Sequence, residues 1–164
     1  MYRITVQHVN KHSFAPKMVQ LRQWTKQILE NIPAQALEKQ KPHNRKNSVF
    51  EVTLRIVDKE EMSILNARFR YKQGPTNVLS FPCELPTGIK LKTLPLGDIV
   101  ICADIVNQEA QVQQKSTDAH WVHMLVHGIL HLLGFDHATT HDAEIMESEE
   151  IRILTLMGFP NPYH

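Results

Sequence analysis

The sequence has few of the features that mark secreted, membrane-bound or strongly charged proteins. Its two cysteines, Cys83 and Cys102, form neither a CxxC pair nor a disulfide framework. No apolar run approaches the roughly 18–20 residues that a membrane-spanning helix needs, and the opening residues, MYRITVQHVN, lack the apolar stretch of a signal peptide. The net charge is only +1, so composition does not point to a polyanionic partner. We therefore expect a cytoplasmic protein without membrane association, whose two thiols are free and buried.

What the sequence does contain is typical of one globular domain. The apolar fraction is 42% and the charged fraction 21%, as in ordinary soluble domains. No repeat, low-complexity tract or linker divides the chain, so we expect a single domain over residues 1–164. Charge is concentrated locally in KQKPHNRK at 39–46 and RFRYK at 68–72. A short basic run of this kind is most simply a solvated loop.

Hydrophobic periodicity predicts both strands and helices. Alternating or continuous apolar residues predict strands at 2–9, 49–58, 77–82 and 97–104. Helical spacing predicts helices at 16–32, near 104–115, near 117–133 and near 140–157, and one more that opens at Asp58. Residues 84–95 are expected to form a loop, because prolines and a glycine interrupt them. The expected fold is a small mixed β-sheet packed with helices, of the α/β or α+β class.

Three histidines occur within residues 127–137, HGILHLLGFDH. His127 and His131 are four residues apart, so a helix would place them on one face. Gly134 can adopt the left-handed conformation that ends a helix, after which the chain can bring His137 back. Three imidazoles leave open the fourth position of a zinc ion, as a hydrolytic site requires. We therefore predict one zinc ion on His127, His131 and His137, with nickel or another divalent ion as a possible occupant.

Several polar residues near this motif allow two interpretations. His120 and His123 share a helical face with His127, and either pack in the core or contact the ligands or the substrate. Asp136 either orients an imidazole or caps a turn. A purely structural metal site would need a fourth ligand, for which His141 and Asp136 are the nearby candidates.

Gly128 stands where zinc proteases of the HExxH type carry their general-base glutamate. Amide hydrolysis needs that group, because it delivers a proton to a poor leaving amine. Phosphodiester cleavage is less demanding, since a metal and an arginine can neutralise the charge on the phosphoryl oxygens. The motif therefore favours phosphoryl transfer over proteolysis, with Arg68 and Arg70 as the candidate arginines.

HGILHLLGFDH closely resembles the H-G-x-L-H-L-x-G-[YF]-D-H signature of YbeY, the bacterial rRNA-maturation endoribonuclease family. Three further blocks are similar to those of the family: LNARFRYKQGPTNVLSFP (65–82), LGDIVIC (96–102) and AHWVHMLVHG (119–128). Two positions depart from the common pattern, since Asn77 replaces a frequent aspartate and Phe135 a frequent tyrosine. Neither residue is a proposed metal ligand. The two departures therefore affect only a role that the aspartate carboxylate or the tyrosine phenol would have.

The resemblance implies a compact α/β domain whose metalloprotease-like site holds one zinc ion on His127, His131 and His137. The arginine that the family needs for activity falls on Arg70, by its distance from PTNVLSF, and not on Arg68. The implied activity is single-strand-specific, metal-dependent cleavage of RNA. The implied role is 3′-end maturation of 16S rRNA and quality control of 70S ribosomes. The implied partners are single-stranded RNA and the ribosome or its small subunit, with no DNA.

Within this interpretation Arg70 contacts the scissile or an adjacent phosphate, and Ser80 or nearby backbone helps to position it. Unpaired bases are candidates to stack on Phe69, Tyr71 or Phe81, although core packing is the simpler role for the phenylalanines. The residues do not decide whether a hydroxide or the RNA 2′-OH is the nucleophile.

Two rival functions remain at this stage. A metallopeptidase would need a carboxylate near the metal, such as that of Glu144 or Glu147. A non-catalytic ribosome assembly factor stabilised by zinc would have a filled fourth coordination position and no turnover.

Overall fold

The computed structural model describes residues 1–9, 13–41, 48–86, 88 and 91–164. Most of the basic cluster at 39–46 lies outside these residues. The elements follow the order β1 (Tyr2–His8), α1 (Met18–Asn31), α2 (Ala34–Glu38), β2 (Val49–Val57), α3 (Lys59–Arg70), β3 (Val78–Pro82), β4 (Thr93–Cys102), α4 (Ala103–Val112), α5 (Thr117–Leu132) and α6 (Thr140–Leu156).

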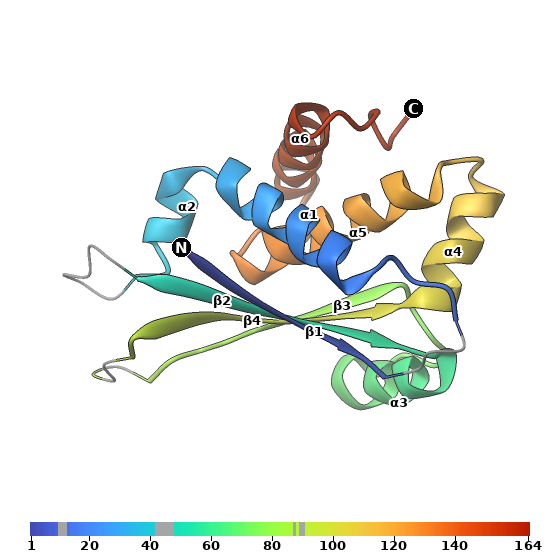
Figure 1. The fold of residues 1–164 in the computed structure, drawn as a ribbon, viewed down its shortest axis with the longest axis horizontal. Helices are drawn as coiled ribbons and strands as arrows, with labels where there is room; N and C mark the ends of the chain where they lie inside the picture. The colour runs from blue at the N-terminus through green and yellow to red at the C-terminus, as the bar shows by residue number, and fades with distance from the viewer. Residues whose placement is uncertain (10–12, 42–47, 87, 89–90) are drawn as a thin grey trace.

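The strands form one mixed sheet in the order β1-β2-β4-β3. β1 pairs with β2, and β2 with β4, in parallel, whereas β3 runs antiparallel to β4. Figure 1 shows α1, α5 and α6 over one face of this sheet, with α3 against the opposite face near one end. The predicted class, a mixed α/β domain with a small sheet, is confirmed.

The main core lies between the sheet and α5. Alternate residues of β2 point into it, because successive side chains of a strand face opposite sides of a sheet. α5 is almost wholly buried, and only a few of its residues reach solvent. No helix in the described part of the chain is both long and apolar enough to cross a membrane.

Two sequence expectations fail at the ends of strands. β4 begins at Thr93, within the segment expected to be a loop, because its backbone pairs with β2 from Val49↔Thr93 onward. The register then shifts so that Glu51 pairs with Pro95 and Val52 with Gly97, and the proline sits at this irregularity. Cys83 was expected to be buried but is exposed, since it follows the last residue of β3, whereas Cys102 is buried as predicted.

The predicted helix that opens at Asp58 is α3, and the Asp58 side chain caps it. The Asp58 carboxylate accepts a hydrogen bond from the backbone N–H of Glu61 at 2.8 Å. The Glu61 carboxylate forms an ion pair with Arg55 of β2 at 2.6 Å. The cap therefore also ties α3 to the sheet.

Candidate metal centre

The C-terminal end of α5 carries the first two predicted ligands, and a tight turn follows it. Gly134 has a φ of +93°, the left-handed conformation that favours glycine. Its N–H donates to the His131 carbonyl at 3.1 Å, and the Phe135 N–H donates to the Leu130 carbonyl at 3.0 Å. These bonds end the helix and reverse the chain, as predicted. His137 consequently lies beside the helix that it has just left.

The structure brings His127, His131 and His137 together. Each offers a ring nitrogen, and the three nitrogens lie within 4.8 Å of one another. The Nε2 atoms of His127 and His131 are 3.1 Å apart, so both face the same point. His137 is exposed, while the other two are half-buried. Burial, followed by the nearness of His127 and His137, lowers the pKa of His131 to about 4.

This donor set fits a metal ion. Neutral imidazoles bind metals, and the lowered pKa of His131 keeps its ring neutral. No fourth His, Cys, Asp or Glu joins the group among the residues with described positions. His141 is exposed and stands apart from it. The geometry thus has three protein donors, which is the number found in open catalytic sites and one fewer than in structural ones.

Asp136 caps the turn that precedes His137. Its Oδ1 accepts a hydrogen bond from the His137 backbone N–H at 2.8 Å. The same oxygen is 3.9 Å from His137 Nδ1, which is too far for a hydrogen bond to the ring. Of the two interpretations of Asp136, the structure therefore supports the turn cap.

Glu150 of α6, which the sequence analysis missed, lies directly behind the cluster. Its Oε1 is 2.6 Å from His127 Nδ1 and its Oε2 is 3.1 Å from His123 Nε2. The Tyr163 hydroxyl donates a further hydrogen bond to Oε2. One signal could have located this residue. Glu150 is a charged residue in the buried stripe of α6, alongside Met146, Ile153 and Leu154.

The environment of Glu150 keeps its carboxylate ionised. Burial alone would raise its pKa, but hydrogen bonds from His123, His127 and Tyr163 outweigh burial and lower the pKa to about 2. Burial and the bond to Glu150 together raise the pKa of Tyr163. The phenol therefore remains the proton donor of this pair.

The two other histidines of α5 are both buried, at 2% exposure for His120 and 8% for His123. His123 reaches the cluster through Glu150. His120 instead contacts Glu109 of α4, 3.1 Å from its Nε2. Asn77, at the position where an aspartate is frequent in the family, donates to the same carboxylate at 3.1 Å. Both histidines are core residues, and only His123 shares a partner with a predicted ligand.

The three histidines line a cleft of about 520 Å³. Arg70, Lys72 and Ser80 line the same cleft. The Arg70 guanidinium donates to the Ser80 carbonyl at 2.8 Å and lies 5.1 Å over the Phe81 ring. The structure therefore places Arg70 in the cleft that holds the histidines.

Arg68 and the candidate stacking residues lie outside this cleft. Arg68 packs over the Phe69 ring at 5.4 Å. Tyr71 is 92% exposed and Phe69 45% exposed, so Phe69 is not a core residue, whereas Phe81 is partly buried. The Ser80 hydroxyl is also committed elsewhere, since it donates to the Gly128 carbonyl at 2.9 Å.

The structure explains why Gly128 is not a glutamate. A Cβ at this position would lie 2.9 Å from Ile99 Cγ2 and 3.3 Å from Ser80 Oγ. Gly128 therefore faces the sheet, and α5 packs so closely there that an added side chain would have to displace Ile99. Glu144 and Glu147 are exposed on α6, and neither lines the cleft. Asp136 is the only carboxylate among the described residues of the cleft wall.

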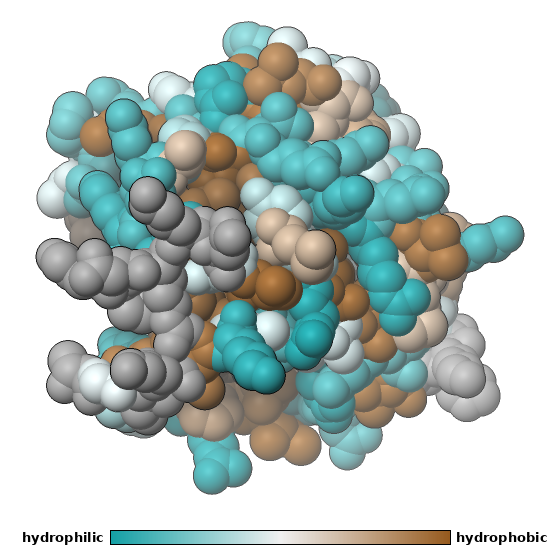
Figure 2. Space-filling model, turned by 60° about the vertical axis from the view of Figure 1, so that its left-hand side comes forward, coloured by the Kyte–Doolittle hydropathy of each residue, from teal (hydrophilic) through white to brown (hydrophobic). Residues whose placement is uncertain are grey.

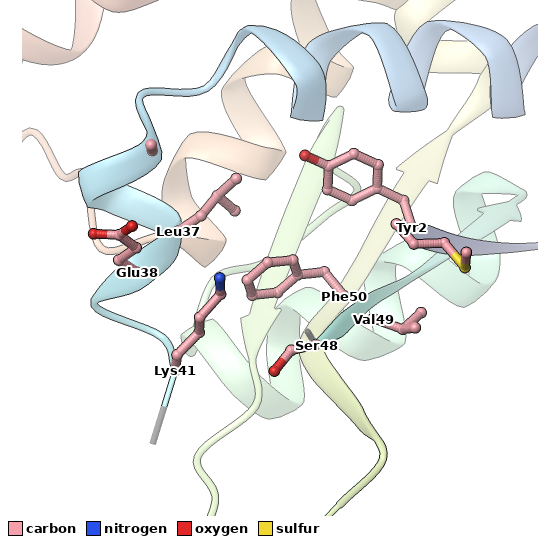
Figure 3. A pocket seen from close by; sticks show the side chains of 9 residues that line it. Tyr2, Leu37, Glu38, Lys41, Ser48, Val49 and Phe50 are labelled. Carbon is pink, nitrogen blue, oxygen red and sulfur yellow. The ribbon is translucent and has the colours of Figure 1, made fainter. Parts of the chain in front are cut away.

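A second hollow of about 540 Å³ lies near the start of β1 and shares no residue with the histidine cleft. Figure 3 shows Tyr2, Phe50 and Lys41 around it. The Lys41 ammonium lies 5.6 Å over the Phe50 ring, which it covers. Hydrophilic and hydrophobic residues are interspersed on the molecular face shown in Figure 2. The described residues that line the second hollow do not include a histidine cluster or an arginine, both of which line the histidine cleft.

The fold and the site together define a class: an α/β protein that gathers three histidines at the end of a central helix, where they can hold a metal ion. The family model described as Endoribonuclease YbeY matches residues 8–158. A Coxiella burnetii protein named Endoribonuclease YbeY is 43% identical over 99% of both chains. One of the same name from Methylococcus capsulatus is 45% identical, over 99% of this chain and 96% of that protein. The chain belongs to the YbeY endoribonuclease family.

A solved structure supports the fold alone. The solution structure of TM1509 from Thermotoga maritima has a TM-score of 0.51 and 21% sequence identity to this chain. The match covers 94% of this chain and 91% of that one.

Proposed function

We propose that this protein is a metal-dependent endoribonuclease that cleaves single-stranded RNA. The observation that carries the proposal is the shared cleft, which three histidine donors line together with Arg70 and Lys72. Relatives over nearly the full length are named endoribonucleases. The cleft has imidazoles and cations suited to a phosphodiester, and it lacks the glutamate on which amide hydrolysis relies.

In this proposal His127, His131 and His137 hold one zinc ion, and nickel or another divalent ion is an alternative occupant. When bound, the ion supplies Lewis-acid chemistry that neutralises negative charge on the phosphodiester. Glu150 holds the His127 ring on the side away from the cleft. Asp136 fixes the backbone of the turn from which His137 projects.

Arg70 is the proposed phosphate-binding residue. Its bonds to the Ser80 and Phe69 carbonyls use two of its five N–H donors, and Phe81 supports the plane of the guanidinium. An arginine held in this way loses little freedom when it binds a phosphate oxygen. Lys72 adds a second positive charge to the same cleft.

The proposed biological substrate is precursor 16S rRNA, cleaved during 3′-end maturation, with a second role in quality control of 70S ribosomes. The partners are then the ribosome or its small subunit, and the site of action is the cytoplasm. A net charge of +1 fits a protein that depends on the ribosome for placement more than on bulk attraction to RNA.

The test is cleavage by purified protein of known zinc content. The substrates are one labelled single-stranded RNA, the same RNA as a duplex, the matching DNA, and an unfolded protein. We expect cleavage of the single-stranded RNA alone, and its loss on chelation or in His127→Ala. Arg70→Ala should lower the rate by about 10²–10³-fold, as removal of a preorganised charge-stabilising donor does.

Arg68→Ala is the matched control, because Arg68 lies on the same helix but outside the cleft. Its rate should stay close to that of the unmodified protein. Cleavage of the protein substrate alone would instead establish a metallopeptidase. Zinc bound in full without cleavage of free or ribosome-bound RNA would favour a non-catalytic assembly factor.

A further inference from the structure

We propose that Glu150 is a positioning residue that fixes the tautomer of His127 for metal binding, and that Tyr163 holds Glu150 in place. The inference rests on the proposed metal-dependent function. It adds that the segment after α6 controls how tightly the site binds metal. Tyr163 contacts Glu150, and no residue of this segment lines the cleft, so its effect on the metal is indirect.

In the hydrogen bond between Glu150 and His127, the histidine ring is the donor. An ionised carboxylate can only accept hydrogen bonds, so the proton in the 2.6 Å contact belongs to His127 Nδ1. A neutral ring protonated at Nδ1 has its lone pair on Nε2. That Nε2 is the atom facing His131 Nε2, 3.1 Å away, at the centre of the cluster. Glu150 thereby directs the lone pair to the place where a metal would be held.

The neighbouring histidine, His131, is supported in a different way from His127. The His131 ring donates a hydrogen bond to the backbone carbonyl of Phe135, in the turn that ends α5. Its orientation therefore depends on local chain geometry. His127 has no such backbone bond among the described contacts, and its ring partner comes from another helix, 23 residues along the chain. Replacing a supporting side chain should therefore disturb the orientation of His127 more than that of His131.

Several hydrogen-bond donors keep the buried carboxylate of Glu150 in place. Glu150 is 1% exposed, and a buried charge is costly unless several donors satisfy it. His123 supplies one donor and the Tyr163 hydroxyl another, both to Oε2. This leaves Oε1 directed at His127. Removal of the phenol would leave Oε2 with one donor fewer and weaken the restraint on the whole carboxylate.

The chain after α6 turns back and brings Tyr163 to Glu150. α6 ends at Leu156, and the chain turns back at Gly158, whose φ is +83°. The Tyr163 ring packs edge-on to His123, with centroids 5.6 Å apart. Lys115 donates to the Pro162 carbonyl at 2.7 Å, which attaches the segment to the turn between α4 and α5. These contacts together hold the segment after α6 against α5 and the turn that precedes it.

The experiment measures zinc affinity by competition with a chelator, together with the tautomer of His127 by nitrogen-15 NMR of the metal-free protein. The variants are Glu150→Gln, Glu150→Ala and Tyr163→Phe. We expect Glu150→Gln to lower zinc affinity by about 10–100-fold, the usual effect of losing a carboxylate that supports a histidine ligand. Tyr163→Phe should lower affinity by less than about tenfold, since the carboxylate remains.

The NMR signature separates positioning from general stability. His127 should be protonated at Nδ1 in the unmodified protein and should show both tautomers in Glu150→Ala. Glu144→Gln is the matched control, because Glu144 is exposed on the same helix, and neither quantity should change. Thermal unfolding of each variant shows whether it is folded, and Tyr163→Phe keeps the test open if a Glu150 variant does not fold.

Unchanged zinc affinity in folded Glu150→Gln and Tyr163→Phe would overturn the inference, as would a proton on Nε2 of His127 in the unmodified protein. Neither measurement involves RNA. Failure of RNA cleavage with the expected affinities and tautomers would therefore count against the proposed function alone.

Discussion

Ser80 of β3 and Gly128 of α5 are joined by a hydrogen bond of 2.9 Å from the serine hydroxyl to the glycine carbonyl. The Ser80 carbonyl accepts at the same time from the Arg70 guanidinium at 2.8 Å. One residue therefore connects the helix that carries His127 with the arginine that lines the same cleft.

Replacing Ser80 by alanine should weaken the connection without removing Arg70 from its place. The lost hydrogen bond should lower the free energy of unfolding by about 0.5–1.5 kcal/mol. The Arg70 contact is made to the backbone and should persist, so RNA cleavage should fall much less than in Arg70→Ala. Chemical denaturation and cleavage rates of the same preparations check this. A loss of activity equal to that of Arg70→Ala would show that the Ser80 hydroxyl itself acts on the substrate.

Gly128→Ala should destabilise the protein even though alanine is the better helix former. The added Cβ would meet Ile99 Cγ2 at 2.9 Å, and Ile99 is fully buried on a strand. Overpacking of this kind costs about 1–3 kcal/mol, against a gain in helix propensity of about 1 kcal/mol. We expect a net loss of about 1 kcal/mol in the free energy of unfolding.

The matched test of that contact is a double-mutant cycle with Ile99→Ala. The smaller side chain makes room for the Cβ, so Gly128→Ala should cost less in the Ile99→Ala background. Strictly additive effects would contradict the proposed clash. Gly128→Glu should likewise destabilise the fold and should not create peptidase activity, because the side chain would point at the sheet.

Helix α5 and the turn that follows it could be predicted from the sequence, because residues close together in the chain determine both. The spacing of His127 and His131 follows from the period of a helix, and Gly134 is a residue that ends one. Arg70 could be separated from Arg68 only by resemblance to the family. No local pattern indicates which of the two lines the cleft.

Contacts between distant elements could not be predicted in this way. Glu150 meets His127 across two helices, and nothing in the spacing along α6 reveals the pairing. Thr93 and Pro95 were expected in a loop because proline disfavours strands, yet pairing with β2 extends β4 across both. In each case a tertiary contact overrides or adds to the local preference.

The two cysteines should differ sharply in reactivity. Cys83 is exposed and Cys102 is buried, and burial raises the pKa of the Cys102 thiol. Because the thiolate is the reactive form, a thiol reagent near neutral pH should label Cys83 promptly and Cys102 only on unfolding. Mass spectrometry of the labelled peptides makes the measurement, and Cys83→Ser should abolish the prompt reaction. Equal labelling rates in the native protein would contradict the burial of Cys102 at the end of β4.

Metal removal should lower the thermal stability of the protein through the histidine cluster. A ligand that binds only the folded state at about 1,000 times its Kd stabilises it by about 4 kcal/mol. For a domain of this size, each kcal/mol shifts the Tm by about 2–4 °C. We therefore expect chelation of the zinc-loaded protein to lower the Tm by about 8–16 °C. His127→Ala should lose most of this shift, while His141→Ala should retain it, because His141 lies outside the cluster. A shift that survives His127→Ala in full would place the stabilising metal somewhere other than at the end of α5.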